Sequence, residues 1–144
     1  MKTRKNIRLQ EYDYSTKGLY FITICTNQMK DLFGQIIDDE VVLNEKGNIV
    51  KKIIEEYNLK SEDVKNDYYQ IMPNHLHIII ELLNDNKVSL SNVVSGLKGK
   101  ITKELHEHNI WQKSYYERII RNDKEYVNIV EYIVNNPYRG KYNW

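Results

Sequence analysis

Two apolar runs, residues 67–72 and 75–83, flank the dipeptide Pro73-Asn74. Proline cannot donate a hydrogen bond to a neighbouring strand, and Pro-Asn is a strong turn signal, so the pattern predicts a β-hairpin rather than one long strand. Every second residue from Leu76 to Leu82 is aliphatic, and side chains alternate across a strand. The second strand therefore has one complete core face and an opposite face that carries His75 and His77.

The rest of the chain alternates between strand and helix signals. Strands are expected at 19–26 and 33–37. Helices are expected at 44–57, starting at Asn44 and Glu45, at 90–106, and from a capping Asp123 towards Asn136, ending near Pro137. The second helix buries a stripe of Val93, Val94, Leu97, Ile101 and Leu105. The order β, α, ββ, α, followed by a further strand and helix, predicts an α+β fold: a ferredoxin-like split βαβ sandwich with helices on one face of a central antiparallel sheet.

Composition indicates one cytoplasmic domain over residues 1–144, large enough to form its own core. Cys25 is the single cysteine and lies in an apolar stretch, which favours a buried thiol in a reducing compartment. The longest apolar runs are too short to span a bilayer, so a membrane is not expected as a partner. The net charge is +1, so bulk charge does not indicate nucleic acid, but the first nine residues carry four positive charges, Arg4 among them.

The spacing of His75 and His77 suits two ligands of one metal ion. The alternative is an ordinary pair of histidines that are satisfied by hydrogen bonds or partly exposed. A second histidine pair, His106 and His108, falls at the end of a predicted helix, where residues two apart point to different sides. A four-histidine zinc site is therefore not expected.

The last predicted helix adds a tyrosine to this set. Helical spacing groups Tyr126, Val130, Ile133 and Val134 into an apolar stripe, flanked by Ile129 and Val127. Tyr132 falls roughly opposite that stripe, with Asn136 one turn later. It is either an amphipathic surface residue or points with Asn136 into a polar site. Two imidazoles and an amide oxygen are able to hold a divalent ion for phosphoryl transfer.

Several ordered motifs give the chain a family resemblance. They are YDYSTKGLYFITICT, LFG, LNEKG, IMPNHLHIII, WQKSYYERIIRN and EYIVNNP, and together they span most of the sequence. With these motifs the sequence resembles the single-tyrosine HUH transposases, specifically the REP-associated tyrosine transposase branch of the IS200-like transposases.

The resemblance implies a role for each matching residue. His75 and His77 match the family's histidine pair, Tyr132 its nucleophile, and Asn136 a polar residue that helps to bind Mg²⁺ or Mn²⁺. The implied activity is cleavage and rejoining of single-stranded DNA near hairpin sequences, through a 5′-phosphotyrosine link. The chain would act as a monomer or a homodimer.

Further residues are expected to contact DNA. Besides Arg4, they are Lys98, Lys100, Lys103, Tyr115, Tyr116, Arg118 and Arg121. Tyr115 and Tyr116 are also rival nucleophiles, although adjacent residues in an extended segment point to opposite faces. Arg118 departs from the family pattern, which has histidine there. Two alternatives remain: a catalytically inactive or domesticated module that binds hairpin DNA or RNA, and an unrelated metal-dependent hydrolase.

Overall fold

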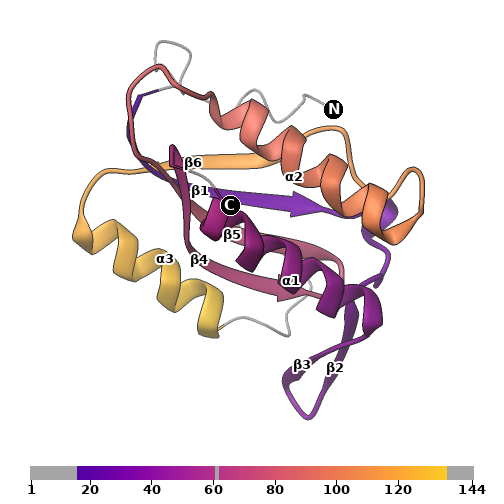
Figure 1. Ribbon diagram of the computed structural model, residues 1–144. Coiled ribbons are helices and arrows are strands. Elements are labelled where there is room, and N and C mark those ends of the chain that lie inside the picture. Colours follow the sequence, from indigo (N-terminus) through magenta and orange to yellow (C-terminus); the bar gives the residue numbers. More distant parts are fainter. Residues whose placement is uncertain (1–15, 61, 136–144) are drawn as a thin grey trace.

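The computed structural model describes residues 16–60 and 62–135, so Arg4 and Asn136 lie outside the described residues (Figure 1). Its centre is a four-stranded sheet in the order β4-β5-β1-β6, in which every pair of neighbours is antiparallel. The strands are β1 (Gly18–Cys25), β4 (Val64–Met72), β5 (His75–Leu82) and β6 (Tyr116–Ile120). The predicted ferredoxin-like arrangement is confirmed, including the strand that was expected after the second helix.

The β4–β5 hairpin turns at Pro73-Asn74, with Met72 opposite His75. β4 begins at Val64, three residues before the predicted start. A register shift between Asn66 and Tyr68 interrupts the alternation there, which conceals the first part of the strand in the sequence. Asn66 is buried, and its side chain donates to the Ile54 carbonyl, so a polar residue at this position is satisfied inside the core.

Helices α1 (Glu45–Lys60) and α2 (Leu90–Leu105) lie side by side on one face of the sheet (Figure 1). They cover the aliphatic face of β5, where Leu76, Ile78 and Ile80 are fully buried. The stripe predicted for α2 is buried as expected, and Ser89 caps this helix by accepting from the Asn92 amide. This face is the main hydrophobic core.

Helix α3 (Asp123–Asn135) packs against the other face, so the expectation that all helices share one face is wrong. A second apolar cluster joins the helix to the sheet. Its buried members are Phe21, Ile79, Ile120, Ile129 and Ile133. The cap of α3 also differs from the prediction, because Asn122, not Asp123, accepts a hydrogen bond from the Glu125 amide through its side chain.

A second, two-stranded sheet pairs β2 (Gly34–Ile37) with β3 (Glu40–Leu43), a strand that the sequence pattern did not reveal. Asp38 and Asp39 form the two-residue turn, and both have positive φ. That backbone conformation matches the twist of the two strands, and aspartate tolerates it better than most residues. This hairpin extends away from the main sheet (Figure 1).

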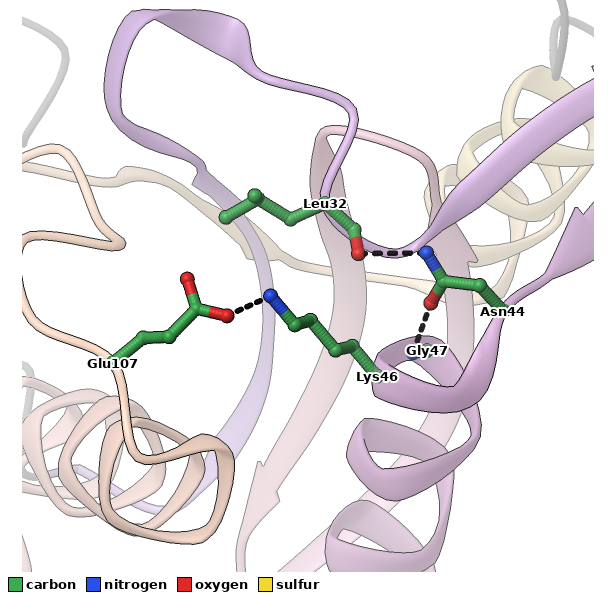
Figure 2. Close-up of polar contacts among 5 residues, drawn as sticks. All are labelled: Leu32, Asn44, Lys46, Gly47 and Glu107. Carbon is green, nitrogen blue, oxygen red and sulfur yellow. Dashed lines mark hydrogen bonds and ion pairs between the residues drawn. The ribbon is translucent and has the colours of Figure 1, made fainter.

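Two of the family-like motifs, LFG and LNEKG, build the start of α1 (Figure 2). The Asn44 side chain accepts from the Gly47 amide at 2.8 Å and donates to the Leu32 carbonyl at 3.0 Å. A Cβ atom at Gly47 would lie 2.2 Å from the Phe33 carbonyl oxygen, so only glycine fits this close approach. Lys46 forms an ion pair with Glu107, which follows α2. These motifs therefore serve the scaffold.

Candidate active site

His75 and His77 lie at the start of β5, on the face opposite the main core, as predicted. Both are buried, with 2% and 5% of their surfaces exposed. Their rings meet edge to face, and the two Nε2 atoms are 3.0 Å apart. The strand thus directs the same nitrogen of both imidazoles to one point.

The other ring nitrogen of each histidine has its own partner. His75 Nδ1 lies 2.8 Å from the side-chain oxygen of Asn74, in the β4–β5 turn. His77 Nδ1 lies 3.0 Å from the Thr23 hydroxyl on β1, and Thr23 is directly opposite His77 in the strand register. Partners of this kind fix the orientation of metal-binding imidazoles.

Burial keeps both imidazoles neutral at physiological pH. Loss of solvation lowers the pKa of His75 to about 2, helped by the charge of His77 when that ring is protonated. Loss of solvation also lowers the pKa of His77 to about 3. Neutral imidazole is the form that donates a lone pair to a metal ion.

A row of four side chains crosses the sheet at His77. Tyr116 on β6 pairs with Thr23, and Gln70 on β4 pairs with His77, so all four face the same side. Thr23 and Gln70 were not among the residues predicted from the sequence. Counting back from the two-residue turn at Pro73-Asn74 would have placed Gln70 opposite His77. Thr23 had no comparable signal, because its register depends on pairing between strands far apart in the chain.

The predicted placement of Tyr132 opposite the apolar side of α3 is wrong, because Tyr132 lies on the same side of the helix as the buried Ile129 and Ile133. It is partly buried and packs against the second apolar cluster, which includes Phe21. The ring centroids of Phe21 and His77 are 5.4 Å apart, so this cluster connects the tyrosine helix to the histidine pair. Val134 and Val127, assigned to the stripe and its flank, are 54% and 49% exposed. The tyrosine and the histidines therefore share one face of the sheet.

The histidine pair fits two ligands of a divalent ion. Neighbouring ligands of an octahedral Mg²⁺ lie about 3.0 Å apart when the bonds are about 2.1 Å long, and the two Nε2 atoms are separated by that distance. Among the described residues, no group of three His, Cys, Asp or Glu side chains is placed to hold a metal ion. A divalent ion at this place would take its further ligands from other oxygen atoms of the protein, from water or substrate, or from residues outside this part of the chain.

The remaining predicted residues divide between the two faces. Tyr115 packs against the main core, whereas Tyr116 and Arg118 alternate onto the histidine face. Arg121 and Lys103 are exposed, and Lys100 pairs with Glu104 at 3.1 Å. Lys98 is only partly exposed, because its ammonium donates to the Gln112 carbonyl at 2.9 Å.

In the described part of the chain, no helix is long and apolar enough to cross a bilayer.

Known proteins resemble this chain in sequence and in fold. The profile of the family described as "Transposase IS200 like" matches residues 16–136. An uncharacterized protein of Haemophilus influenzae is 37% identical, over 93% of this chain and 88% of its own length. A REP-associated tyrosine transposase of Escherichia coli is 34% identical, over 51% of this chain and 43% of its own. The structure titled "Structure of the REP associates tyrosine transposase bound to a REP hairpin" superimposes with a TM-score of 0.69 at 24% identity, covering 90% of this chain and 72% of that one.

The fold, a four-stranded antiparallel sheet with helices on both faces, is that of transposases with known structures. The family match extends over most of the sequence, from before β1 to the residue after α3. The chain belongs to the IS200-like transposase family. The class of function that this family implies is DNA transposition.

Proposed function

We propose that the chain cleaves and rejoins single-stranded DNA beside hairpin sequences, with Tyr132 as the nucleophile. His75, His77 and Asn136 are the proposed ligands of a Mg²⁺ or Mn²⁺ ion. One observation carries the proposal: two neutral imidazoles direct their Nε2 atoms to one point, on the sheet face against which the Tyr132 helix packs. An unrelated hydrolase that used the histidines alone would leave the placement of Tyr132 without a role.

The proposed reaction is an exchange of phosphodiester bonds. The Tyr132 hydroxyl loses its proton and attacks a backbone phosphorus, forming a bond from the phenol oxygen to the 5′-phosphate. The bond from phosphorus to the 3′ oxygen breaks, and that oxygen leaves as a hydroxyl after it takes up a proton. Because one phosphodiester replaces another, a 3′-hydroxyl is able to reverse the step and rejoin strands without ATP.

The side chains around the histidines have separate tasks. A divalent ion held by His75, His77 and Asn136 would offset the negative charge that develops on the phosphate oxygens. Mn²⁺ accepts imidazole nitrogen more readily than Mg²⁺, which prefers oxygen. The cluster around Phe21, Ile129 and Ile133 orients α3 against the sheet and so sets the position of Tyr132.

The substrate is proposed to be a folded single strand of DNA. The structural relative described above is titled as bound to a REP hairpin. In this chain Tyr116 and Arg118 lie on the histidine face, where an aromatic ring suits stacking on a base and a guanidinium suits a phosphate. Lys100, Lys103 and Arg121 would add contacts to the backbone of the hairpin.

The test is a covalent adduct on a denaturing gel. The protein is incubated with hairpin-bearing single-stranded DNA, labelled at its 3′ end so that the label stays on the 5′-phosphorylated fragment, in Mn²⁺ or Mg²⁺. We expect a labelled adduct with the parent chain and none with Tyr132→Phe. Tyr126→Phe is the matched control, because it removes a hydroxyl from the same helix and should leave the adduct in place.

Two results would assign the chemistry elsewhere. An undiminished adduct in Tyr132→Phe that disappears in Tyr116→Phe would make Tyr116 the nucleophile. Tight hairpin binding by the parent chain, with no adduct in either metal, would support a binding module without cleavage. Loss of cleavage with retained binding in His75→Ala and His77→Ala is the result expected of metal ligands.

A further inference from the structure

The side chain of Asn74 is held in one orientation by the loop after β1. Its amide nitrogen faces the Met29 carbonyl at 3.5 Å, and its oxygen faces His75 Nδ1 at 2.8 Å. The same loop also binds the turn at the Asn74 carbonyl: the Thr26 amide donates to it at 3.0 Å, and the Thr26 hydroxyl, which lies 2.8 Å from the Lys30 carbonyl, is 3.0 Å from the same oxygen. The Phe33 amide donates to the Pro73 carbonyl, also at 3.0 Å. The turn therefore presents an amide oxygen to His75.

An amide oxygen only accepts hydrogen bonds, so the proton of neutral His75 lies on Nδ1. Its Nε2 then carries the lone pair. The 3.0 Å separation of the two Nε2 atoms is a hydrogen-bond length, and such a bond requires one proton between them. Without metal, that proton lies on His77 Nε2. His77 Nδ1 is then an acceptor, and the Thr23 hydroxyl donates to it.

We infer that Asn74 and Thr23 are positioning residues of the histidine pair, with different tasks. Asn74 fixes His75 in the tautomer that exposes an Nε2 lone pair. Thr23 supports His77 in both tautomers, since a hydroxyl either donates or accepts. To bind a metal through Nε2, His77 would lose the proton from Nε2 and take one up at Nδ1, so the ring would stay neutral. The Thr23 hydroxyl would then turn to accept a hydrogen bond from Nδ1. The metal-bound half of this inference rests on the proposed function.

The metal-free half has its own test. Long-range ¹⁵N–¹H correlation spectra of the labelled, metal-free chain distinguish the two neutral tautomers of each histidine. We expect the proton of His75 on Nδ1 and that of His77 on Nε2. Saturating Mg²⁺, which is diamagnetic, should move the His77 proton to Nδ1 and leave His75 unchanged. A metal-free His77 that already carries its proton on Nδ1 would overturn the inference.

Metal affinity tests the role of Thr23 without any cleavage assay. Free Mn²⁺ is measured by its electron paramagnetic resonance signal during titration of the chain. Thr23→Val keeps the shape of the side chain and removes the hydroxyl, so it should weaken Mn²⁺ binding about 10- to 100-fold. Thr23→Ser restores a hydroxyl, so its Mn²⁺ affinity should stay within about threefold of that of the parent chain. This change is well below the roughly 10- to 100-fold loss typical when a hydrogen-bond partner of a metal ligand is removed. Thr102→Val on α2 is the matched control and should bind as the parent does.

The outcomes separate this inference from the proposed function. Parent-like binding by Thr23→Val would remove the role of Thr23 and leave the metal site in place. No binding of Mn²⁺ or Mg²⁺ by the parent chain would remove both the metal site and the tautomer change. The spectra of the metal-free chain would then be the test of the two metal-free tautomers.

Discussion

The buried histidine pair makes the folded chain sensitive to acid. The folded-state pKa values of His75 and His77 are about 2 and about 3, whereas an unfolded histidine has a pKa of 6.5. A histidine with a lowered folded pKa contributes stability above pH 6.5, and this contribution is lost as pH falls through the interval down to about 3. In that interval the unfolded chain binds two protons that the folded chain does not.

The size of the effect follows from proton linkage. Each proton bound only by the unfolded chain lowers the free energy of unfolding by about 1.4 kcal/mol per pH unit. Two histidines, followed from pH 7.5 to 4.5, therefore remove about 5 kcal/mol. Domains of this size have total stabilities of about 5–15 kcal/mol, so the loss is large enough to unfold a marginal one.

The measurement is urea unfolding in EDTA at steps of pH between 7.5 and 4.5, for the parent chain and for His77→Gln. Beyond the contribution of the other titrating groups, the free energy of unfolding of the parent should fall with pH at a slope that corresponds to nearly two protons. The slope for His77→Gln should correspond to about one proton less. Ile78→Val is the control: it shortens a fully buried side chain of the same strand, so it should lower stability by about 1 kcal/mol equally at every pH. Parallel pH profiles of the parent and His77→Gln would refute the neutral state of the buried histidine.

Three further predictions concern the scaffold. The Tyr126 hydroxyl donates to Asp67 at 2.5 Å, and loss of solvation together with this bond raises the pKa of Tyr126 to about 12. Below pH 10, Tyr126→Phe should lower the free energy of unfolding by about 1 kcal/mol. Between pH 10 and 12 the parent chain should lose stability as pH rises and the variant should lack this loss, and urea unfolding measures both effects. Gly47→Ala should lower the free energy of unfolding by about 2 kcal/mol or more, because the new Cβ would meet the Phe33 carbonyl. Gly96→Ala, whose Cβ would have nothing within 4 Å, should instead stabilise α2 by about 1 kcal/mol. Equal effects of the two substitutions would contradict the close approach at Gly47. Helix α3 buries two side chains and α2 buries six, so native-state hydrogen exchange should be faster in α3, and equal protection of the two helices would count against this reasoning.

The sequence predicted those parts of the fold that depend on local patterns. The β4–β5 hairpin follows from Pro73-Asn74 between two apolar runs, and the buried side of α2 follows from its helical stripe. The strand β3 has only four residues, and two of them are exposed, so it has too little pattern to detect. The first part of β4 was missed because a bulge breaks its alternation.

The orientation of α3 shows the limit of the helical stripe as a guide. Helical spacing puts valines at both edges of the apolar side of α3, but Val127 and Val134 are exposed, and the sheet face that the helix covers also carries polar side chains. Ile129 and Ile133 are buried in the cluster on that face, and the amphipathic ring of Tyr132 packs against the same cluster. The position of Tyr132 depends on this tertiary surface, which no pattern within one helix contains.

The two faces of the sheet divide stability and chemistry between them. The face under α1 and α2 carries the larger apolar cluster, although Asn66 and Glu117 are also buried on it, so most of the buried apolar side chains lie on this side. The opposite face can then carry buried polar groups: Thr23, His75 and His77 in hydrogen-bonded contact, beside a small cluster under α3. Because α3 buries two side chains and α2 buries six, we expect the helix that carries Tyr132 to move more readily than α2 does. Under the proposed function Tyr132 becomes joined to DNA and must later release it, which needs that freedom, whereas the histidine pair, fixed between β1 and the β4–β5 turn, does not.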